Sequence, residues 1–376
     1  MRKIYLLAVL LLGSTLVSRA QQYYMLVGTY TTGSDSKGIY VYKFDGTTGT
    51  TALVSTKADF NPSYLALTDG GKKVYVANED ISSAEKGKGA ISAYTFDKKK
   101  GELTLLNSVS ALGQSPCFVA TDKKGLDVLA ANYGSGSVVL YRTEKNGALQ
   151  KEKTQFIQHE GKSVHPNQEG PHAHSTFIAP DGKYVFALNL GNDLIYKYNF
   201  DPKSNTPLTA GTPATYKVPD GYGPRHLVFS KDGKYAYVLC ELIGKIIAYA
   251  YNDGNLQQLQ ILDAAPQVDK NLDNGSAAIR VSPDGQFLYA SNRGTANTVA
   301  IFHIENDGRL IHVDDKKVGT HPRDFDLTPD GNFLVVASRD DNAVEIYPVD
   351  KETGLLKEKK NVLNIPKPVS VIFTKY

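Results

Sequence analysis

Hydrophobic and polar residues alternate in short runs along this chain, and turn residues separate the runs. The segment from His172 to Asn189, HAHSTFIAPDGKYVFALN, shows the unit: an apolar run, a Pro-Asp-Gly turn and a second run rich in aromatic and aliphatic residues. Two such runs joined by a tight turn predict an antiparallel pair of strands. No stretch after residue 20 has a long helical period, so the pattern predicts an all-β protein.

The unit recurs about every fifty residues. Its turn glycines are Gly71, Gly125, Gly182, Gly233, Gly285 and Gly331. A period near 50 is the size of a four-stranded propeller blade. A length of 376 residues would suggest two domains, but a closed ring of blades is a single cooperative unit, so the repeat overrides that expectation.

A further alternating strand follows each unit, and seven such strands accompany only six complete inner hairpins. The two ends of the chain supply the missing hairpin: PVSVIF (368–373) has the pattern of a first strand and YYMLVGTY (23–30) that of a second. Pairing them would close the ring and remove the open sheet edges. The sequence therefore predicts a seven-bladed β-propeller over residues 21–376, with a composite closing blade formed by the N- and C-terminal strands.

Residues 1–20 are expected to be a secretory signal peptide. Arg2 and Lys3 precede an apolar run from Ile4 to Val17, and small residues lead to a cleavage position after Ala20. The run is too short for a membrane span, so no membrane association is expected after cleavage. The predicted location is periplasmic or extracellular.

Loss of the three basic residues of this leader takes the formal charge from +3 to 0, and nothing suggests a nucleic-acid partner. Cys117 and Cys240 fall in non-adjacent blades and are expected to be free, semi-buried thiols. The oligomeric state stays open.

The repeat also predicts which side chains share a rim. Residues about eight before and eight after each turn glycine should lie at the rim opposite the turns, near the ring axis. These positions collect His174, Arg225, Arg323, Glu241, Arg293, Arg339 and Glu79. Ligand sites of propellers are usually at this central mouth. A structural role in fastening blades competes with the functional one, above all for Arg339 and Glu79.

Asn78, Asn132, Asn189 and Asn292 occupy the position seven after the glycine and are expected mainly to satisfy backbone groups at strand ends. Asn132 is kept as a candidate substrate-binding residue, as is His172, which alternates with His174. The histidine pair could hold a metal with His165 or Glu169 from the loop 151–170, but its spacing is weak evidence and no metal or cofactor is predicted. That loop is a candidate lid over the mouth.

The chemistry is limited by what the chain lacks. It has no G-x-S-x-G, H-E-x-x-H or phosphate-cradling G-x-x-x-x-G-K-[ST] motif. It also contains no Trp, which excludes the tryptophan docking motifs of quinone-dependent propellers. Arginine clusters bind carboxylate or phosphate, and a His or Glu among them can move a proton. The rim therefore suits an anionic sugar acid or dicarboxylate, with arginines stabilising an oxyanion.

Several motifs resemble one family. In order they are NPSYLAL, VYVANE, LAANYGSGSV, GPHAHS, GPRHLVFSKDGKYAYVLCEL and LYASNRG. This set is similar to that of the seven-bladed propeller lactonases, which include propeller-type 6-phosphogluconolactonase and the 3-carboxy-cis,cis-muconate lactonising enzyme. The resemblance spans almost the whole chain after the leader.

The resemblance implies a lactone hydrolase that works without a metal and carries its site on His174, Arg225, Glu241 and Arg293. Glu241 or His174 would activate water, and the arginines would hold the anionic group and the oxyanion. His172, Arg323, Arg339, Glu79 and Asn132 remain candidate substrate contacts. Two alternatives stay open: a lactonising cyclase, and an exported propeller without activity that binds a glycan or a protein. The cationic rim with an embedded His and Glu favours an enzyme over such a platform.

Overall fold

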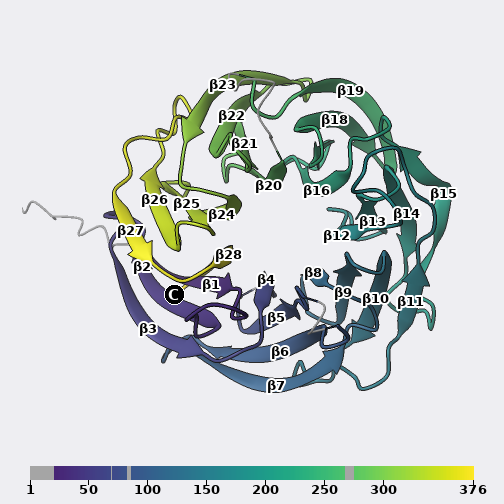
Figure 1. Ribbon diagram of the computed structural model, residues 1–376, viewed down its shortest axis with the longest axis horizontal. Coiled ribbons are helices and arrows are strands. Elements are labelled where there is room, and N and C mark those ends of the chain that lie inside the picture. The colour runs from purple at the N-terminus through teal and green to yellow at the C-terminus, as the bar shows by residue number, and fades with distance from the viewer. Residues whose placement is uncertain (1–20, 69, 83–85, 267–274) are drawn as a thin grey trace, which may run out of the picture.

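A computed structural model describes residues 21–68, 70–82, 86–266 and 275–376, and their strands form seven four-stranded antiparallel sheets arranged in a ring (Figure 1). No helix occurs in these ranges. The predicted all-β seven-bladed propeller is confirmed. No helix of the described chain is long and apolar enough to cross a membrane. The signal-peptide prediction falls on residues 1–20, outside the described residues.

The blades are numbered here in chain order, beginning with the blade that contains the first strand. Blade 1 contains β28 (Pro368–Lys375), β1 (Gln22–Thr29), β2 (Ile39–Asp45) and β3 (Thr51–Lys57). Blade 2 contains β4 (Pro62–Leu67), β5 (Lys73–Asn78), β6 (Ala90–Asp97) and β7 (Glu102–Ser110). Blade 3 contains β8 (Pro116–Thr121), β9 (Asp127–Asn132), β10 (Ser137–Arg142) and β11 (Gln155–Gln158). Blade 4 contains β12 (Ala173–Ile178), β13 (Tyr184–Asn189), β14 (Leu194–Phe200) and β15 (Leu208–Lys217).

The remaining three blades repeat the same order. Blade 5 contains β16 (Pro224–Phe229), β17 (Tyr235–Cys240), β18 (Lys245–Asn252) and β19 (Asn255–Asp263). Blade 6 contains β20 (Ser276–Val281), β21 (Phe287–Asn292), β22 (Thr298–Ile304) and β23 (Leu310–Lys317). Blade 7 contains β24 (Pro322–Leu327), β25 (Phe333–Ser338), β26 (Ala343–Pro348) and β27 (Asn361–Asn364).

Blade 1 closes the ring as predicted. Strand β28 pairs with β1 along nearly its whole length, with Leu26 opposite Ile372 and Met25 opposite Phe373. On its other side β1 pairs with β2, so neither edge of β1 is left without a partner strand. Figure 1 shows the yellow C-terminal strand beside the purple N-terminal one.

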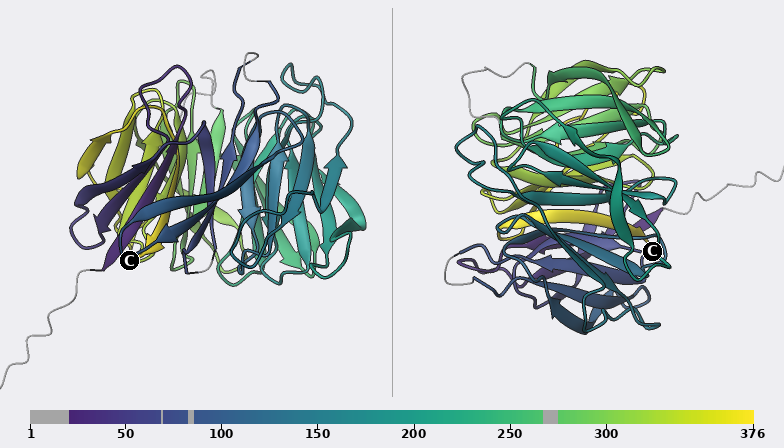
Figure 2. Two further views of the ribbon diagram at one scale, coloured as in Figure 1. Left: turned by 90° about the horizontal axis from the view of Figure 1, so that it is seen from below. Right: turned by 90° about the vertical axis from the view of Figure 1, so that its right-hand side faces the viewer.

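The first strand of each blade lies nearest the axis and contacts the first strands of both neighbouring blades, which gives a continuous inner ring (Figure 1). Seen from the side, the strands run between two rims (Figure 2). One rim carries the turn glycines, which adopt the left-handed φ that the Pro-Asp-Gly type of turn requires, for example +70° at Gly182 and +71° at Gly233. Residues before the first strand and after the second therefore meet at the other rim.

Apolar clusters between neighbouring sheets hold the blades together. Phe186 of blade 4 and Tyr249 of blade 5 belong to one cluster, and Tyr237 of blade 5 and Phe302 of blade 6 belong to the next. Burial of these large rings removes much apolar surface from water and fixes the angle between blades. Cys117 and Cys240 are free, as predicted, and both are buried rather than semi-buried.

Each inner strand has an irregularity at the rim opposite the turns. The pairing of β12 with β13 shifts register between Ala173 and Ser175, so His174 is an extra residue, and the same shift leaves Arg225 extra in β16 and Arg323 extra in β24. A β-bulge redirects the side chain of its extra residue. The bulges of blades 4, 5 and 7 therefore redirect His174, Arg225 and Arg323 at this rim.

Candidate active site

A cavity of about 580 Å³ opens at the bulge rim around the axis. The predicted residues that line it are Glu79, His174, Glu241, Arg293, Arg323 and Arg339. They come from five different blades, and only the common rim position brings them together. The prediction that these side chains converge at the central mouth agrees with this placement.

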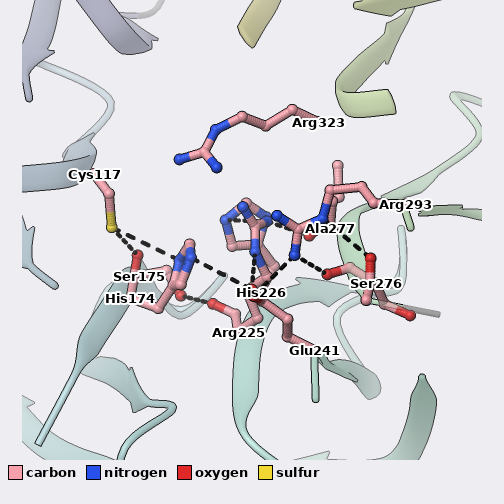
Figure 3. A network of polar contacts seen from close by, with 12 residues as sticks. Cys117, His174, Ser175, Arg225, His226, Glu241, Ser276, Ala277, Arg293 and Arg323 are labelled. Carbon is pink, nitrogen blue, oxygen red and sulfur yellow. Dashed lines mark hydrogen bonds and ion pairs between the residues drawn. The ribbon is translucent and has the colours of Figure 1, made fainter. Parts of the chain in front are cut away.

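Two arginines hold the carboxylate of Glu241. Arg293 Nη2 lies 2.9 Å from Oε1, and Arg225 Nε lies 2.7 Å from Oε2 (Figure 3). Burial by itself would raise the pKa of Glu241, but the charges of Arg293 and Arg225 overcome it and hold the pKa well below its usual range. Glu241 is therefore an ionised carboxylate at neutral pH.

Backbone carbonyls at the start of β20 and of the residue before it fix both guanidinium groups. Arg293 donates from Nε to Gly275 O at 3.1 Å and from Nη2 to Ser276 O at 3.1 Å, and Arg225 donates from Nη1 to Ala277 O. Arg225 Nε has no well-aligned hydrogen bond, so its contact with Glu241 is ionic. Burial, chiefly, lowers the pKa of Arg225 to about 10, and the group remains charged at neutral pH. The two cations are thus preorganised before any ligand arrives.

His174 lies on the blade 4 side of this clamp. Its Nε2 is 3.8 Å from Glu241 Oε2, and its backbone carbonyl accepts from Cys117 Sγ at 3.3 Å. Burial, reinforced by the charge of Arg225, lowers the pKa of His174 well below 6.5. The imidazole is consequently neutral near pH 7, with its Nδ1 3.8 Å from Cys117 Sγ and its Nε2 facing Glu241.

Aromatic rings form the floor beneath His174 and Arg225. His226 lies edge-on to His174 with ring centroids 5.4 Å apart and edge-on to Phe118 at 5.3 Å, and Tyr64 stacks on Phe118 at 4.2 Å. Tyr64 and Phe118 also line a second cavity, of about 420 Å³. The floor lowers the local polarity, which strengthens every charge interaction above it.

The wall opposite the clamp is also cationic. Tyr30 donates from its hydroxyl to Glu79 Oε2 at 2.8 Å, and Arg323 lies 3.6 Å from the same oxygen and over the Tyr30 ring. Arg323 stands apart from the Glu241 network in Figure 3.

Two further cations complete this wall. Arg339 makes a two-point pair with Asp340 at 2.8 and 3.0 Å, and Lys367 lies 3.5 Å from Asp340. Four cations and three carboxylates line the whole cavity, so it carries an excess positive charge.

Three of the predicted site residues do not line the cavity: Arg225, which is buried beside Glu241, Asn132 and His172. Asn132 is fully buried and donates to Ala111 O and Ser137 Oγ, both at 3.0 Å, which is the strand-end role expected for this set of asparagines. His172 stacks on Tyr133 and bonds from Nδ1 to Tyr133 O at 2.8 Å. The bulge at His174 breaks the alternation that would have put both histidines on one face.

The lid prediction is wrong. Part of the loop 151–170 is strand β11, and Gln168 is buried against blade 4, where it donates to Leu190 O at 2.7 Å and Asp193 Oδ1 at 2.8 Å. No residue of the loop lines the cavity. The metal alternative finds no support either: no group of three His, Cys, Asp or Glu side chains suited to a metal occurs in the described ranges.

The count of eight residues from each turn glycine did not identify two residues of the cavity wall. Tyr30 and Lys367 line the cavity, but both belong to blade 1, whose hairpin is split between the two chain ends and has no turn glycine. The signal was available in the GTYT sequence at 28–31, which stands at the same strand end as VYVANE in blade 2. Alignment on strand ends instead of turns would have found Tyr30.

The fold and the site define a class: a seven-bladed propeller whose axial cavity holds an arginine-clamped carboxylate beside a neutral histidine. This chain belongs to the family described as Lactonase, 7-bladed beta-propeller, whose model matches residues 24–373. The resemblance read from the sequence is therefore confirmed, and the enzyme is favoured over a binding platform.

Named relatives agree with this family. The 6-phosphogluconolactonase of Bacillus subtilis is 36% identical over 94% of this chain and 98% of its own length. A solved structure assigned as a 6-phosphogluconolactonase from Bacteroides fragilis is 41% identical, with a TM-score of 0.89 over 94% of this chain and 98% of its own. The periplasmic gluconolactonase of Pseudomonas aeruginosa is 34% identical, with a TM-score of 0.89 over 94% of this chain and 99% of its own.

Proposed function

We propose that the cavity hydrolyses the ester of an anionic sugar-acid lactone of the 6-phosphogluconolactone type and uses only side chains of this chain. The observation that carries the proposal is the clamp of Arg225, Glu241 and Arg293 beside neutral His174. A carboxylate held by two fixed guanidinium groups is a poor proton acceptor, because protonation would break both ion pairs. His174 is the better base.

In the proposed reaction His174 takes a proton from water as the water oxygen attacks the lactone carbonyl carbon. The negative charge that develops on the carbonyl oxygen is stabilised by Arg293, which lines the cavity. Collapse breaks the bond between the carbonyl carbon and the ring oxygen, and the imidazolium returns the proton to the departing alkoxide. Glu241 stabilises the imidazolium, while buried Arg225 positions Glu241. The product is the open hydroxy acid.

The opposite wall is assigned the anionic substituent of the lactone. Arg323, Arg339 and Lys367 supply three cations, and Glu79 and Asp340 neutralise only part of their charge. Arginine binds phosphate and carboxylate through two parallel hydrogen bonds, and lysine adds a point charge. A substrate that reaches from the clamp to this wall would be held at both ends.

The test is a panel of lactones with the protein that begins at Gln21. The panel holds 6-phosphogluconolactone, unphosphorylated gluconolactone and a carboxymuconolactone, each with and without a chelator. We expect turnover that survives the chelator and falls at least about 100-fold in Arg293→Lys, which keeps the charge and loses the two-point geometry. Absence of turnover on every lactone by a folded protein would refute the proposal.

We further propose that the chain is exported. The charged, apolar and small-residue segments of residues 1–20 support this, and a periplasmic relative with the same fold makes it reasonable. Expression in a bacterial host followed by fractionation and N-terminal sequencing tests it. A periplasmic product that begins at Gln21 is expected, and a cytoplasmic product that retains Arg2 would contradict it.

A further inference from the structure

One position of the repeat seals the seam between neighbouring blades at the turn rim. The outer turn joins the third and fourth strands of a blade and begins with an acidic or amide residue. The position meant here lies in the second strand, and its partner in the third strand is the residue two before that acidic or amide residue. Its occupants around the ring are Tyr24, Lys73, Asp127, Tyr184, Tyr235, Phe287 and Phe333. Five of the seven are aromatic.

In six blades this side chain packs on a glycine of the next blade's outer turn. Tyr184 covers Gly254, Phe287 covers Gly354, and Lys73 covers Gly147, each so closely that a Cβ on the glycine would collide. The side chain acts as a wedge that fills the seam. We call this position the wedge position.

Blade 3 breaks the pattern on both sides of its seam. Its wedge position holds Asp127, and the outer turn of blade 4 that should receive a ring reads DPKSNTP (201–207), without glycine. A groove of about 900 Å³ opens at this seam. Its walls include the apolar side chains of Leu126, Ile178 and Phe200.

The carboxylate on this groove lacks a hydrogen bond that it needs. Asp127 is 1% exposed, and its Oδ1 atom is buried with no hydrogen-bond partner. Arg142 Nε lies 3.8 Å from Oδ1, beyond hydrogen-bond distance, because this arginine donates instead to Pro202 O and Ser204 O across the seam. Burial and the neighbouring Asp122 raise the pKa of Asp127 to about 6. Buried carboxylates of proteins normally accept a hydrogen bond, so Asp127 Oδ1 is a candidate acceptor for a donor on a ligand.

We propose that this groove is a second binding site, distinct from the catalytic cavity, for a small aromatic amine. The apolar ring would take the place of the missing wedge against Leu126, Ile178 and Phe200, and the protonated amine would donate to Asp127 Oδ1. Lys123, Lys124 and Lys203 also border the groove, but they are exposed and screened by water, whereas the charge of Asp127 is buried. Arg142 also lines the groove, but it stays 3.8 Å from Asp127 Oδ1 and its Nη2 donates to Pro202 O and Ser204 O. The buried charge therefore sets the preference for a cation.

The probe is 2-phenylethylamine, with 3-phenylpropionate as its charge-reversed counterpart, and binding is followed by ligand-observed NMR and titration calorimetry. We expect the amine to bind in the millimolar range, which suits a ligand of its size, and the acid to bind at least about tenfold more weakly. Asp127→Asn keeps the shape, removes the charge and should weaken the amine by at least about tenfold.

Two further variants complete the test. Asp127→Phe puts a wedge back into the seam and should abolish binding, and Asp181→Asn is the matched control, because Asp181 borders the same groove but already accepts from Tyr251. Lactone hydrolysis should be unchanged in all three variants, since the groove lies at the turn rim and the catalytic cavity at the other. Equal binding of the amine by wild type and Asp127→Asn, or no binding by wild type, would overturn the proposal.

Discussion

Glu241 is the residue on which the charge balance of the site depends. Its carboxylate neutralises part of the positive charge of Arg225 and Arg293, both of which are fixed by backbone carbonyls. Arg225 is almost completely buried. Removal of one partner from such a group leaves an uncompensated buried charge, which costs far more than the pair contributes when intact.

Glu241→Gln should therefore lower the free energy of unfolding by about 3 kcal/mol and reduce kcat by at least about 100-fold. Urea unfolding and steady-state lactone hydrolysis measure the two effects. Glu345→Gln is the control: Glu345 is buried, is paired with Lys359 and does not line the cavity, so stability should fall while kcat is kept. Wild-type kcat in Glu241→Gln would exclude the clamp from catalysis.

The pH dependence follows from His174. Its pKa is lowered in the folded protein, so it stays neutral, and able to accept a proton, below the pH at which an ordinary histidine becomes charged. We expect kcat/KM to remain level as the pH falls through 6.5 and to decline only at lower pH. An acid limb at or above 6.5 would contradict the assignment of His174 as base.

The same shift has a consequence for stability with a defined sign. Between the folded pKa and the unfolded value of about 6.5, the unfolded chain binds a proton at this histidine and the folded chain does not. The contribution of His174 is therefore lost as the pH falls below that unfolded value. The difference in unfolding free energy between wild type and His174→Gln should shrink over this range.

At the scale of the element, the turn glycines do not all serve one purpose. Gly182 has φ +70°, and a Cβ added to it would meet no other atom within 4 Å, so its requirement is only conformational. Gly71 has φ +62° and faces Thr374 of β28, against which a Cβ would collide. The same residue type thus relieves backbone strain in blade 4 and also allows the contact with the closing strand in blade 2.

Gly182→Ala should cost about 1 kcal/mol, the price of a left-handed φ for a residue with a Cβ. Gly71→Ala should cost that amount and about 1–3 kcal/mol more, because Thr374 and its strand must move. Urea unfolding of the two variants measures the difference. Equal losses would mean that the closing strand yields to the added atom without strain.

The inner hairpin also shows what the sequence could and could not predict. Turn glycines and alternation located the blades, and a count of eight residues found the rim positions of His174, Arg225, Glu241 and Arg293. The count could not locate the bulges, because the extra residue leaves no mark in the polarity pattern. For that reason His172 was expected beside His174, although it stacks on Tyr133 outside the cavity. Blade 1 has no turn glycine to count from, so the count did not identify Tyr30 and Lys367 as residues of the cavity.

For the whole molecule, the cavity depends on the ring being closed, since its wall is drawn from blades that are far apart in sequence. Strand β28 carries the closure: it pairs with β1 and packs against the inner strands of blades 2 and 7. Its loss would expose the backbone groups of β1 and separate Lys367 and Arg323 from the Tyr30 side of the wall.

Deletion of residues 368–376 should abolish cooperative unfolding and lactone hydrolysis together. Because β1 would then present an open edge of defined register, a synthetic peptide of residues 366–376 should add back as a strand and restore part of the activity. The peptide with Ile372→Pro is the control, since it removes a donor from the ladder and should not rescue. Activity of the truncated chain without peptide would show that the blades hold their positions without closure, and the site would then have to be assembled by the inter-blade clusters alone.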